Sequence, residues 1–161
     1  MALAAMTAAC GRAAPPVPAE PPPRGVLSAE WIYTPATAET EAATGAVTVE
    51  ASVGTDGPSR TLIAARGARV RAVLKGPIVM DETLAAALAQ RASPMLYTIA
   101  EGNLCADVQA THLVWSEPEL VEGRTLAVAA LAGGAPGETG STVCRVLRYT
   151  RNRDAHAEGV R

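Results

Sequence analysis

Two histidines, His112 and His156, are the side chains best suited to proton transfer near neutral pH, and the 161 residues include no others. Catalysis would also need a nucleophile and an orienting carboxylate within hydrogen-bonding reach. No serine stands in the G-x-S-x-G pattern that presents a hydrolase nucleophile. We expect His112 to lie in a strand and His156 to be solvated in a polar tail. The sequence therefore predicts no catalytic residue, no metal ligand set and no cofactor site.

An acidic segment follows Trp115 and contains Glu117, Glu119 and Glu122. Calcium sites use several oxygen ligands at defined spacing, and this segment lacks such a pattern. We expect a solvated loop. A site for calcium or for a basic partner is the alternative.

Four arginines lie close together near the end of the chain: Arg145, Arg148, Arg151 and Arg153. Guanidinium groups bind phosphate in a bidentate manner, so these residues could contact anionic headgroups or an envelope polysaccharide. The alternative is that they solvate an edge strand and keep it from aggregating.

Trp31, Tyr33 and Trp115 belong to a small aromatic set in a chain without phenylalanine. If exposed, they would anchor a partner; if buried, they would be core residues. The net charge of −2 argues against a nucleic-acid-binding protein, which usually carries a strong basic excess. No stretch reaches the roughly 18–20 apolar residues of a membrane-spanning helix.

A short apolar segment, residues 2–9, ends in small residues directly before Cys10. Secretory signals have small residues at their cleavage site, and a cysteine just after that site resembles the lipobox of bacterial lipoproteins. The resemblance implies that residues 1–9 are a signal-like segment, truncated at its charged start, and that Cys10 carries acyl chains. Residues 10–23 then comprise the anchor and a proline-rich linker, which favours an extended conformation. In that family an aspartate after the cysteine retains some proteins at the inner membrane, and Gly11 stands there in this chain, so the resemblance implies the outer membrane rather than the inner one.

Cys105 and Cys144 are the cysteines that remain once Cys10 is assigned to the anchor. An exported domain folds in an oxidising compartment, where two cysteines in one small domain are expected to pair. Such a crosslink contributes about 3–4 kcal/mol in the chain-entropy model. Two free thiols, or a catalytic thiol beside His112, are the alternatives. We predict a Cys105–Cys144 disulfide.

Residues 24–150 predict a single β-rich domain, followed by a polar tail at 151–161. Short apolar segments with period-two alternation are separated by turn residues. Segment 125–131 is apolar on both faces, which predicts a central strand paired with 142–149. The fold is expected to be mainly β, with α+β as the alternative, as an antiparallel sheet, sandwich or barrel. Strands are predicted at 46–53, 61–65, 69–74, 95–100, 111–115, 125–131 and 142–149.

One helix is predicted over residues 81–92. Asp81 is a suitable N-cap, Leu84 and Leu88 share a face, and Pro94 ends the helix. The narrow apolar stripe suggests that it covers a sheet edge or a barrel mouth. The glycine-rich segment 133–141 precedes a strand rather than a helix, so it predicts a hairpin connection and no phosphate-binding loop.

The segments 103–115 and 124–149 resemble the C-terminal half of small uncharacterised proteobacterial lipoproteins, through an LC pair, an apolar strand, a Gly/Pro turn and a second cysteine. A more distant architectural similarity is to the periplasmic C-type lysozyme inhibitors. These resemblances imply a lipid-anchored envelope protein at the periplasmic face.

Of the functions considered, we expect a non-catalytic module that binds another protein or a polysaccharide of the envelope. The alternative is an inhibitor of a cell-wall hydrolase such as lysozyme, which would block a cleft with a loop such as 133–141 or 116–123. A small enzyme is the third alternative.

Overall fold

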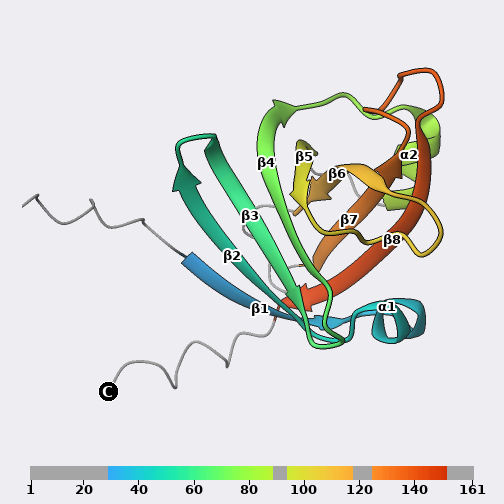
Figure 1. Ribbon diagram of the computed structural model, residues 1–161. Coiled ribbons are helices and arrows are strands. Elements are labelled where there is room, and N and C mark those ends of the chain that lie inside the picture. Colours follow the sequence, from blue (N-terminus) through green and yellow to red (C-terminus); the bar gives the residue numbers. More distant parts are fainter. Residues whose placement is uncertain (1–28, 89–93, 118–124, 152–161) are drawn as a thin grey trace, which may run out of the picture.

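Antiparallel strands pair in chain order, and the first strand pairs with the last, which closes a barrel (Figure 1). The computed structural model describes residues 29–88, 94–117 and 125–151. This confirms the mainly β fold and selects the barrel from the three arrangements considered. Within the described residues the strands are β1 (Ala29–Pro35), β2 (Val47–Gly54), β3 (Gly57–Ala64), β4 (Arg69–Pro77), β5 (Met95–Glu101), β6 (Ala110–Ser116), β7 (Thr125–Ala132) and β8 (Thr142–Arg151).

The strand alternation seen in the sequence separates the inside of the barrel from its outside. On β2, Val47 and Val49 are buried while Thr48 between them is only half-buried. Successive side chains of a strand point to opposite faces, so one valine set fills the interior. The interior cluster combines aliphatic residues from β2, β3, β4, β6, β7 and β8 with buried aromatic residues, among them Tyr33 of β1, Tyr97 of β5 and Tyr149 of β8. Eight strands make a barrel whose interior is just wide enough to be filled by side chains or to hold one small ligand.

Strand β7 is buried on both faces, as its sequence predicts. Leu126 and Val128 belong to the interior cluster, whereas Ala127 and Ala129 belong to a second cluster on the outer face. β7 pairs along its whole length with β8, which confirms the predicted pairing of the last two strands.

Helix α2 (Glu82–Leu88) creates that second cluster by covering the outer wall of the barrel. The backbone N–H of Leu84 donates to Oδ1 of Asp81 at 2.7 Å, so the predicted N-cap is confirmed. Leu84 and Leu88 are buried against the outward residues of β6 and β7. The expected position at a sheet edge or barrel mouth is therefore wrong. A closed barrel has no edge, and the apolar outer face of β7 is the surface that must be covered.

Helix α1 (Ala38–Ala43) and strand β1 were not predicted from the sequence. α1 has six residues and one buried side chain, Thr40, so it shows no apolar periodicity. Thr37 caps it by accepting a hydrogen bond from the backbone N–H of Thr40 at 3.2 Å. β1 is defined by its partners, because it joins β2 and makes three residue pairs with β8.

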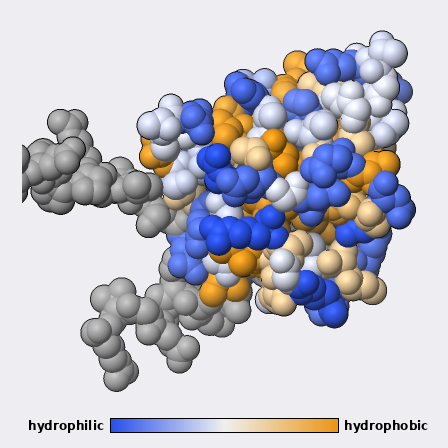
Figure 2. Space-filling view, viewed as in Figure 1, coloured by the Kyte–Doolittle hydropathy of each residue, from blue (hydrophilic) through white to orange (hydrophobic). Residues whose placement is uncertain are grey.

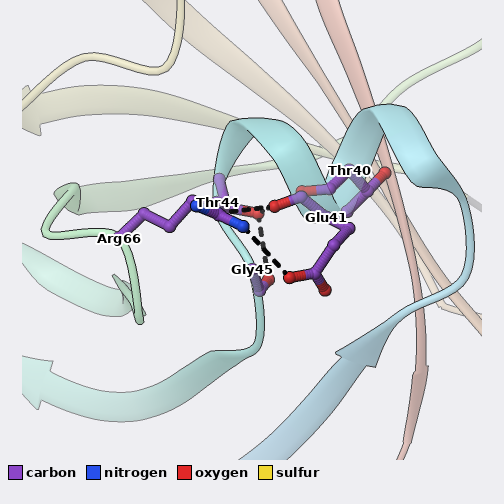
Figure 3. Close-up of polar contacts among 5 residues, drawn as sticks. All are labelled: Thr40, Glu41, Thr44, Gly45 and Arg66. Carbon is purple, nitrogen blue, oxygen red and sulfur yellow. Dashed lines mark hydrogen bonds and ion pairs between the residues drawn. The ribbon is translucent and has the colours of Figure 1, made fainter.

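The end of α1 is tied to the turn between β3 and β4 (Figure 3). Arg66 Nε donates to the carbonyl of Glu41 at 2.7 Å, and its Nη2 lies 3.3 Å from the Glu41 carboxylate. The N–H of Gly45 bonds the same carbonyl at 3.0 Å, with the glycine at φ +64°. Because both charged side chains are more than half exposed, this ion pair adds little stability. The backbone contacts fix where the helix ends.

Cys105 and Cys144 lie at disulfide-bonding distance, with their Cα atoms 5.8 Å apart. Cys105 is in the connection between β5 and β6, and Cys144 is near the start of β8. The predicted proximity of the two cysteines is thus confirmed. Segment 133–141 connects β7 to β8 as a hairpin, as predicted.

Hydrophilic and hydrophobic residues are interspersed over the face shown in Figure 2. Among the described residues the exposed large hydrophobic side chains are Val53, Val79 and Val108, which come from separate segments. No described helix has the length and apolar character needed to span a membrane.

Candidate functional site inside the barrel

Arg60 is a charged residue on the inward face of β3. It lies two positions before Leu62 and four before Ala64, both of which belong to the interior cluster. Its guanidinium carbon lies 4.8 Å from the ring centroid of Trp115, 5.9 Å from that of Trp31 and 6.0 Å from that of Tyr97. Each distance lies within the range of cation–π attraction. Three aromatic rings from three strands therefore surround one cation.

Glu117 supplies the opposite charge. Arg60 Nη1 lies 3.2 Å from Oε2 of Glu117, and the Tyr33 hydroxyl donates to Oε1 at 2.6 Å. Both carboxylate oxygens are thus engaged. Glu117 immediately follows the last residue of β6, so the cluster lies at the end of the barrel where β6 ends. We call Tyr33, Arg60, Trp115 and Glu117 the carboxylate cluster.

The electrostatics of the carboxylate cluster keep Glu117 ionised. Burial raises the pKa of its carboxyl group, but the hydrogen bonds from Tyr33 and Arg60, together with the Arg60 charge, outweigh burial and leave the pKa below its usual value. Burial and the bond to Glu117 raise the pKa of the Tyr33 hydroxyl. Burial also raises the pKa of Tyr97, which faces the same guanidinium. At neutral pH the cluster contains one cation, one anion and the neutral phenol of Tyr33, and the phenol of Tyr97 beside it is also neutral.

Trp115 adds a third donor near the carboxylate. Its indole N–H favours the ionised form of Glu117, although the two groups do not meet hydrogen-bond geometry. Trp115 is 3% exposed, and its Nε1 has no hydrogen-bond partner among the described residues. A buried donor without a partner costs about 1–3 kcal/mol. The cluster therefore holds one unsatisfied group.

Solvent reaches the charged pair in part. The side chains of Arg60 and Glu117 are 25% and 23% exposed. A pair at this depth loses some hydration, so its attraction is partly offset by desolvation. The ion pair is therefore not expected to add much to the stability of the fold, and stability does not explain why two charged residues lie among apolar ones.

Burial decides between the two interpretations of the aromatic residues, and it corrects the expectation for Glu117. Trp115 and Tyr33 are buried core residues, so they are not exposed partner contacts. Trp31 is half-buried and packs against the interior cluster. Glu117 was expected in a solvated loop, but its bonds to Tyr33 and Arg60 place it in the barrel end. Glu119 and Glu122 lie outside the described residues.

The arginines of β8 do not solvate an edge strand, because β8 pairs with both β7 and β1. Arg145, Arg148 and Arg151 are half-buried on this strand. Arg148 donates from Nη2 to the carbonyl of Ala87 in α2, and so joins the helix to the barrel wall. Arg153 lies outside the described residues.

The remaining candidate residues from the sequence are not part of the carboxylate cluster. His112 is a half-buried residue of β6 whose Nδ1 lies 3.0 Å from the Thr111 hydroxyl. In the described part of the chain no group of three or more His, Cys, Asp or Glu residues could hold a metal ion. His156, Cys10, the signal-like segment and the proline-rich linker lie outside the described residues.

Arg60 is the site residue that sequence reasoning missed. The sequence predicts a strand that begins at residue 61, whereas β3 begins at Gly57, so the prediction does not include Arg60 in the strand. Extending the predicted strand by one residue towards the N-terminus would have placed this arginine on the same face as Leu62. Neither Arg60 nor Tyr33 could have been paired with Glu117 without the barrel.

Comparisons with known proteins supply no family for this arrangement. No family model matches the chain, and no curated protein or solved structure matches it either.

Proposed function

We propose that this chain is a non-catalytic binding protein of the bacterial envelope, held at the periplasmic face of a membrane by a lipid on Cys10. The binding surface in this proposal is the barrel end that carries the carboxylate cluster. The observation that carries it is the quarter-exposed Arg60–Glu117 pair among three aromatic rings. Charged groups within an apolar barrel are functional candidates, because packing alone does not require them.

The chemistry of the cluster favours binding over catalysis. The charge of Arg60 is balanced by Glu117. The pKa of the Tyr33 hydroxyl is raised and that of the Glu117 carboxyl group is lowered, so neither group is suited to exchange a proton near neutral pH. The accessible part of the cluster is instead the Arg60–Glu117 pair, about one quarter exposed, beside the half-buried ring of Trp31, and such a surface would recognise an apolar body with a charged group. Binding sites commonly combine an apolar lining with a few placed polar groups.

The envelope location is supported by two features of the chain. Cys105 and Cys144 lie at disulfide-bonding distance, and disulfides persist in oxidising compartments. The small-residue segment before Cys10 and the proline-rich segment after it suit an anchor and a spacer.

Expression in a bacterium with the natural upstream region tests the location. The wild type is expected in the membrane fraction with an acylated Cys10, and Cys10→Ala is expected in the soluble periplasmic fraction. Cys144→Ser serves as the control for loss of a different cysteine, and it should remain membrane-bound. A wild-type protein found unacylated and reduced in the cytosol contradicts the location.

Sedimentation with purified cell-wall sacculi and with envelope protein extract tests the binding function. The wild type is expected to be retained, and Arg60→Gln to be retained at least about tenfold less. Arg71→Gln is the matched control, because Arg71 pairs with Asp56 and Glu101 on the outer side of the barrel. Equal retention of all three proteins contradicts binding through the barrel end.

A hydrolase inhibitor is the second candidate, and the β7–β8 hairpin favours it. The hairpin is ordered by its own contacts: the N–H of Ala135 donates to the Glu138 carboxylate at 2.8 Å, and Ser141 Oγ donates to the carbonyl of Gly134 at 3.2 Å. A pre-ordered loop can enter a cleft with little loss of entropy. Lysozyme activity measured with and without the protein, and with Glu138→Gln, separates this candidate from the first.

A further inference from the structure

Two donors bond one carboxylate, and the indole N–H of a third residue, Trp115, is a buried donor near it. The Tyr33 hydroxyl and Arg60 Nη1 bond its two oxygens at 2.6 and 3.2 Å, and the Trp115 indole N–H favours its charge from a position outside bonding geometry. Hydrogen bonds to an ionised acceptor are about twice as strong as neutral ones. This donor set is suited to hold a carboxylate in general.

We propose that Glu117 occupies a binding site for an external carboxylate, and that the ligand is a small carboxylic acid with an apolar body. This inference rests on the proposed binding function and names the ligand class of the same barrel end. Glu117 then acts as an internal substitute for the ligand.

The unsatisfied indole of Trp115 indicates that Glu117 fits this donor set incompletely. Trp115 is 3% exposed and its Nε1 has no partner among the described residues, while Glu117 already uses both oxygens on Tyr33 and Arg60. A free carboxylate is not restrained by the chain and can approach all three donors. Satisfying a buried donor is worth about 1–3 kcal/mol.

The position of Glu117 makes exchange physically accessible. It follows β6 directly and is held to the cluster by its side chain, whereas Tyr33 and Arg60 are anchored within strands. Its side chain and that of Arg60 are about one quarter exposed, so solvent already contacts the pair. Exchange of one carboxylate for another conserves the charge balance around Arg60, which avoids leaving a partly buried cation unpaired.

We infer the apolar part of the ligand from the residues that lie next to the carboxylate cluster. Trp31, Leu74 and Met95 are partly buried hydrophobic residues packed against the interior cluster. Met95 is paired with Trp115, and Leu74 with Tyr97. The partly exposed apolar surface therefore lies beside the aromatic rings that surround the guanidinium. A ligand that is charged at one end and apolar at the other matches both.

Phenylacetate is the probe, and phenylacetamide is its neutral control. Trp31 and Trp115 are the two tryptophans of the chain, and both rings lie within 6 Å of the Arg60 guanidinium carbon, so tryptophan fluorescence reports occupation directly. The proteins compared are the wild type, Glu117→Gln, Arg60→Gln and the outer-face control Arg71→Gln.

Glu117→Gln removes the competing charge while keeping the shape of the side chain. It is expected to bind phenylacetate at least about tenfold more tightly than the wild type, because a charge-assisted hydrogen bond is worth 1.5 kcal/mol or more. Phenylacetamide should bind all proteins weakly, Arg60→Gln should lose saturable binding, and Arg71→Gln should match the wild type. Equal affinity of Glu117→Gln for the acid and the amide, or no gain over the wild type, overturns the proposal.

A second measurement keeps the proposal testable if Glu117→Gln does not fold. The indole N–H resonance of Trp115 in the wild type is followed while phenylacetate is added to tens of millimolar at constant ionic strength. A saturable shift with the acid and none with the amide supports the exchange, and an unchanged resonance overturns it. These titrations do not involve Cys10, so their failure is distinct from failure of the membrane location or of sacculus binding.

Discussion

The hydroxyl of Thr44 lies 2.8 Å from the phenolic hydroxyl of Tyr149, which joins the end of α1 to the interior of the barrel at β8. Thr44 also donates to the carbonyl of Thr40 at 3.1 Å, and Thr40 accepts from the N–H of Arg148 at 2.9 Å. A short polar helix thus reaches the core through hydroxyl groups. The barrel therefore has two separate polar features, the carboxylate cluster and the contact between Thr44 and Tyr149.

Removing the Tyr149 hydroxyl tests the contribution of this contact. Tyr149→Phe is expected to lower the free energy of unfolding by about 1 kcal/mol, because Thr44 keeps its bond to Thr40. Thr44→Val should cost more, about 1–3 kcal/mol, because it leaves the buried Tyr149 hydroxyl without this partner. Urea unfolding followed by fluorescence measures both. A Tyr149→Phe variant as stable as the wild type would show that the contact contributes nothing.

Alkaline titration tests the burial of the tyrosines. The chain contains three tyrosines, Tyr33, Tyr97 and Tyr149, and burial raises the pKa of each, that of Tyr149 to about 12. Absorbance at tyrosinate wavelengths should therefore stay low through about pH 10 in the folded protein, where unfolded tyrosines are half ionised.

The same shift has a consequence for stability. A group whose pKa is raised in the folded state stabilises that state fully below its unfolded pKa, and the contribution is lost as the pH rises above about 10. Unfolding at pH 7 and pH 11 should show a lower free energy at pH 11. Tyrosine absorbance that titrates identically in native and urea-unfolded protein would contradict the burial.

Acid titration tests the ionised state of Glu117. Because its folded-state pKa is lowered, its contribution to stability is present above the unfolded value and is lost as the pH falls below about 4. Glu117→Gln should be less stable than the wild type at pH 7, by about 1–3 kcal/mol, and the difference should narrow at pH 3. Glu41→Gln is the control, because Glu41 forms an exposed pair with Arg66. A difference that does not depend on pH would contradict the assigned role of the charge.

Reduction tests the crosslink between Cys105 and Cys144. The two residues are separated by 39 positions, and the chain-entropy model gives a loop of that length about 4 kcal/mol. Cys105→Ser combined with Cys144→Ser should lower the free energy of unfolding by about that amount relative to the oxidised protein. Intact mass after alkylation, with and without reductant, establishes the oxidised state. Two thiols alkylated in the native exported protein would contradict the disulfide.

Gly102 tests the packing of the chain where β5 ends. It has φ +87°, and a Cβ atom there would collide with the carbonyl of Arg69. Gly57 has φ +102°, but a Cβ atom there would meet nothing within 4 Å. Gly57→Ala should therefore show conformational strain alone, about 1 kcal/mol, and Gly102→Ala an added 1–3 kcal/mol from the collision. Equal losses for the two variants would show that the close approach is unimportant.

The sequence by itself determined most of the strands after β1 and which of their faces are buried. Alternation at Val47 and Val49 fixes which side of β2 is buried, because a strand has a period of two. The all-apolar character of β7 likewise identified a strand covered on both sides, and Asp81 marked the start of α2. These features depend on residues that are close together in the sequence, so they can be derived from the sequence alone.

Only the tertiary structure decided what the barrel end contains. Closure between β1 and β8, which rests on three residue pairs, brings Tyr33 within reach of Glu117 at a sequence separation of 84. Arg60 reaches the same carboxylate across 57 positions. No local sequence pattern predicts contacts between residues so far apart in the chain, because nothing in the segment around each side chain indicates its partner. The charges become a site only when strands far apart in the chain enclose a common interior.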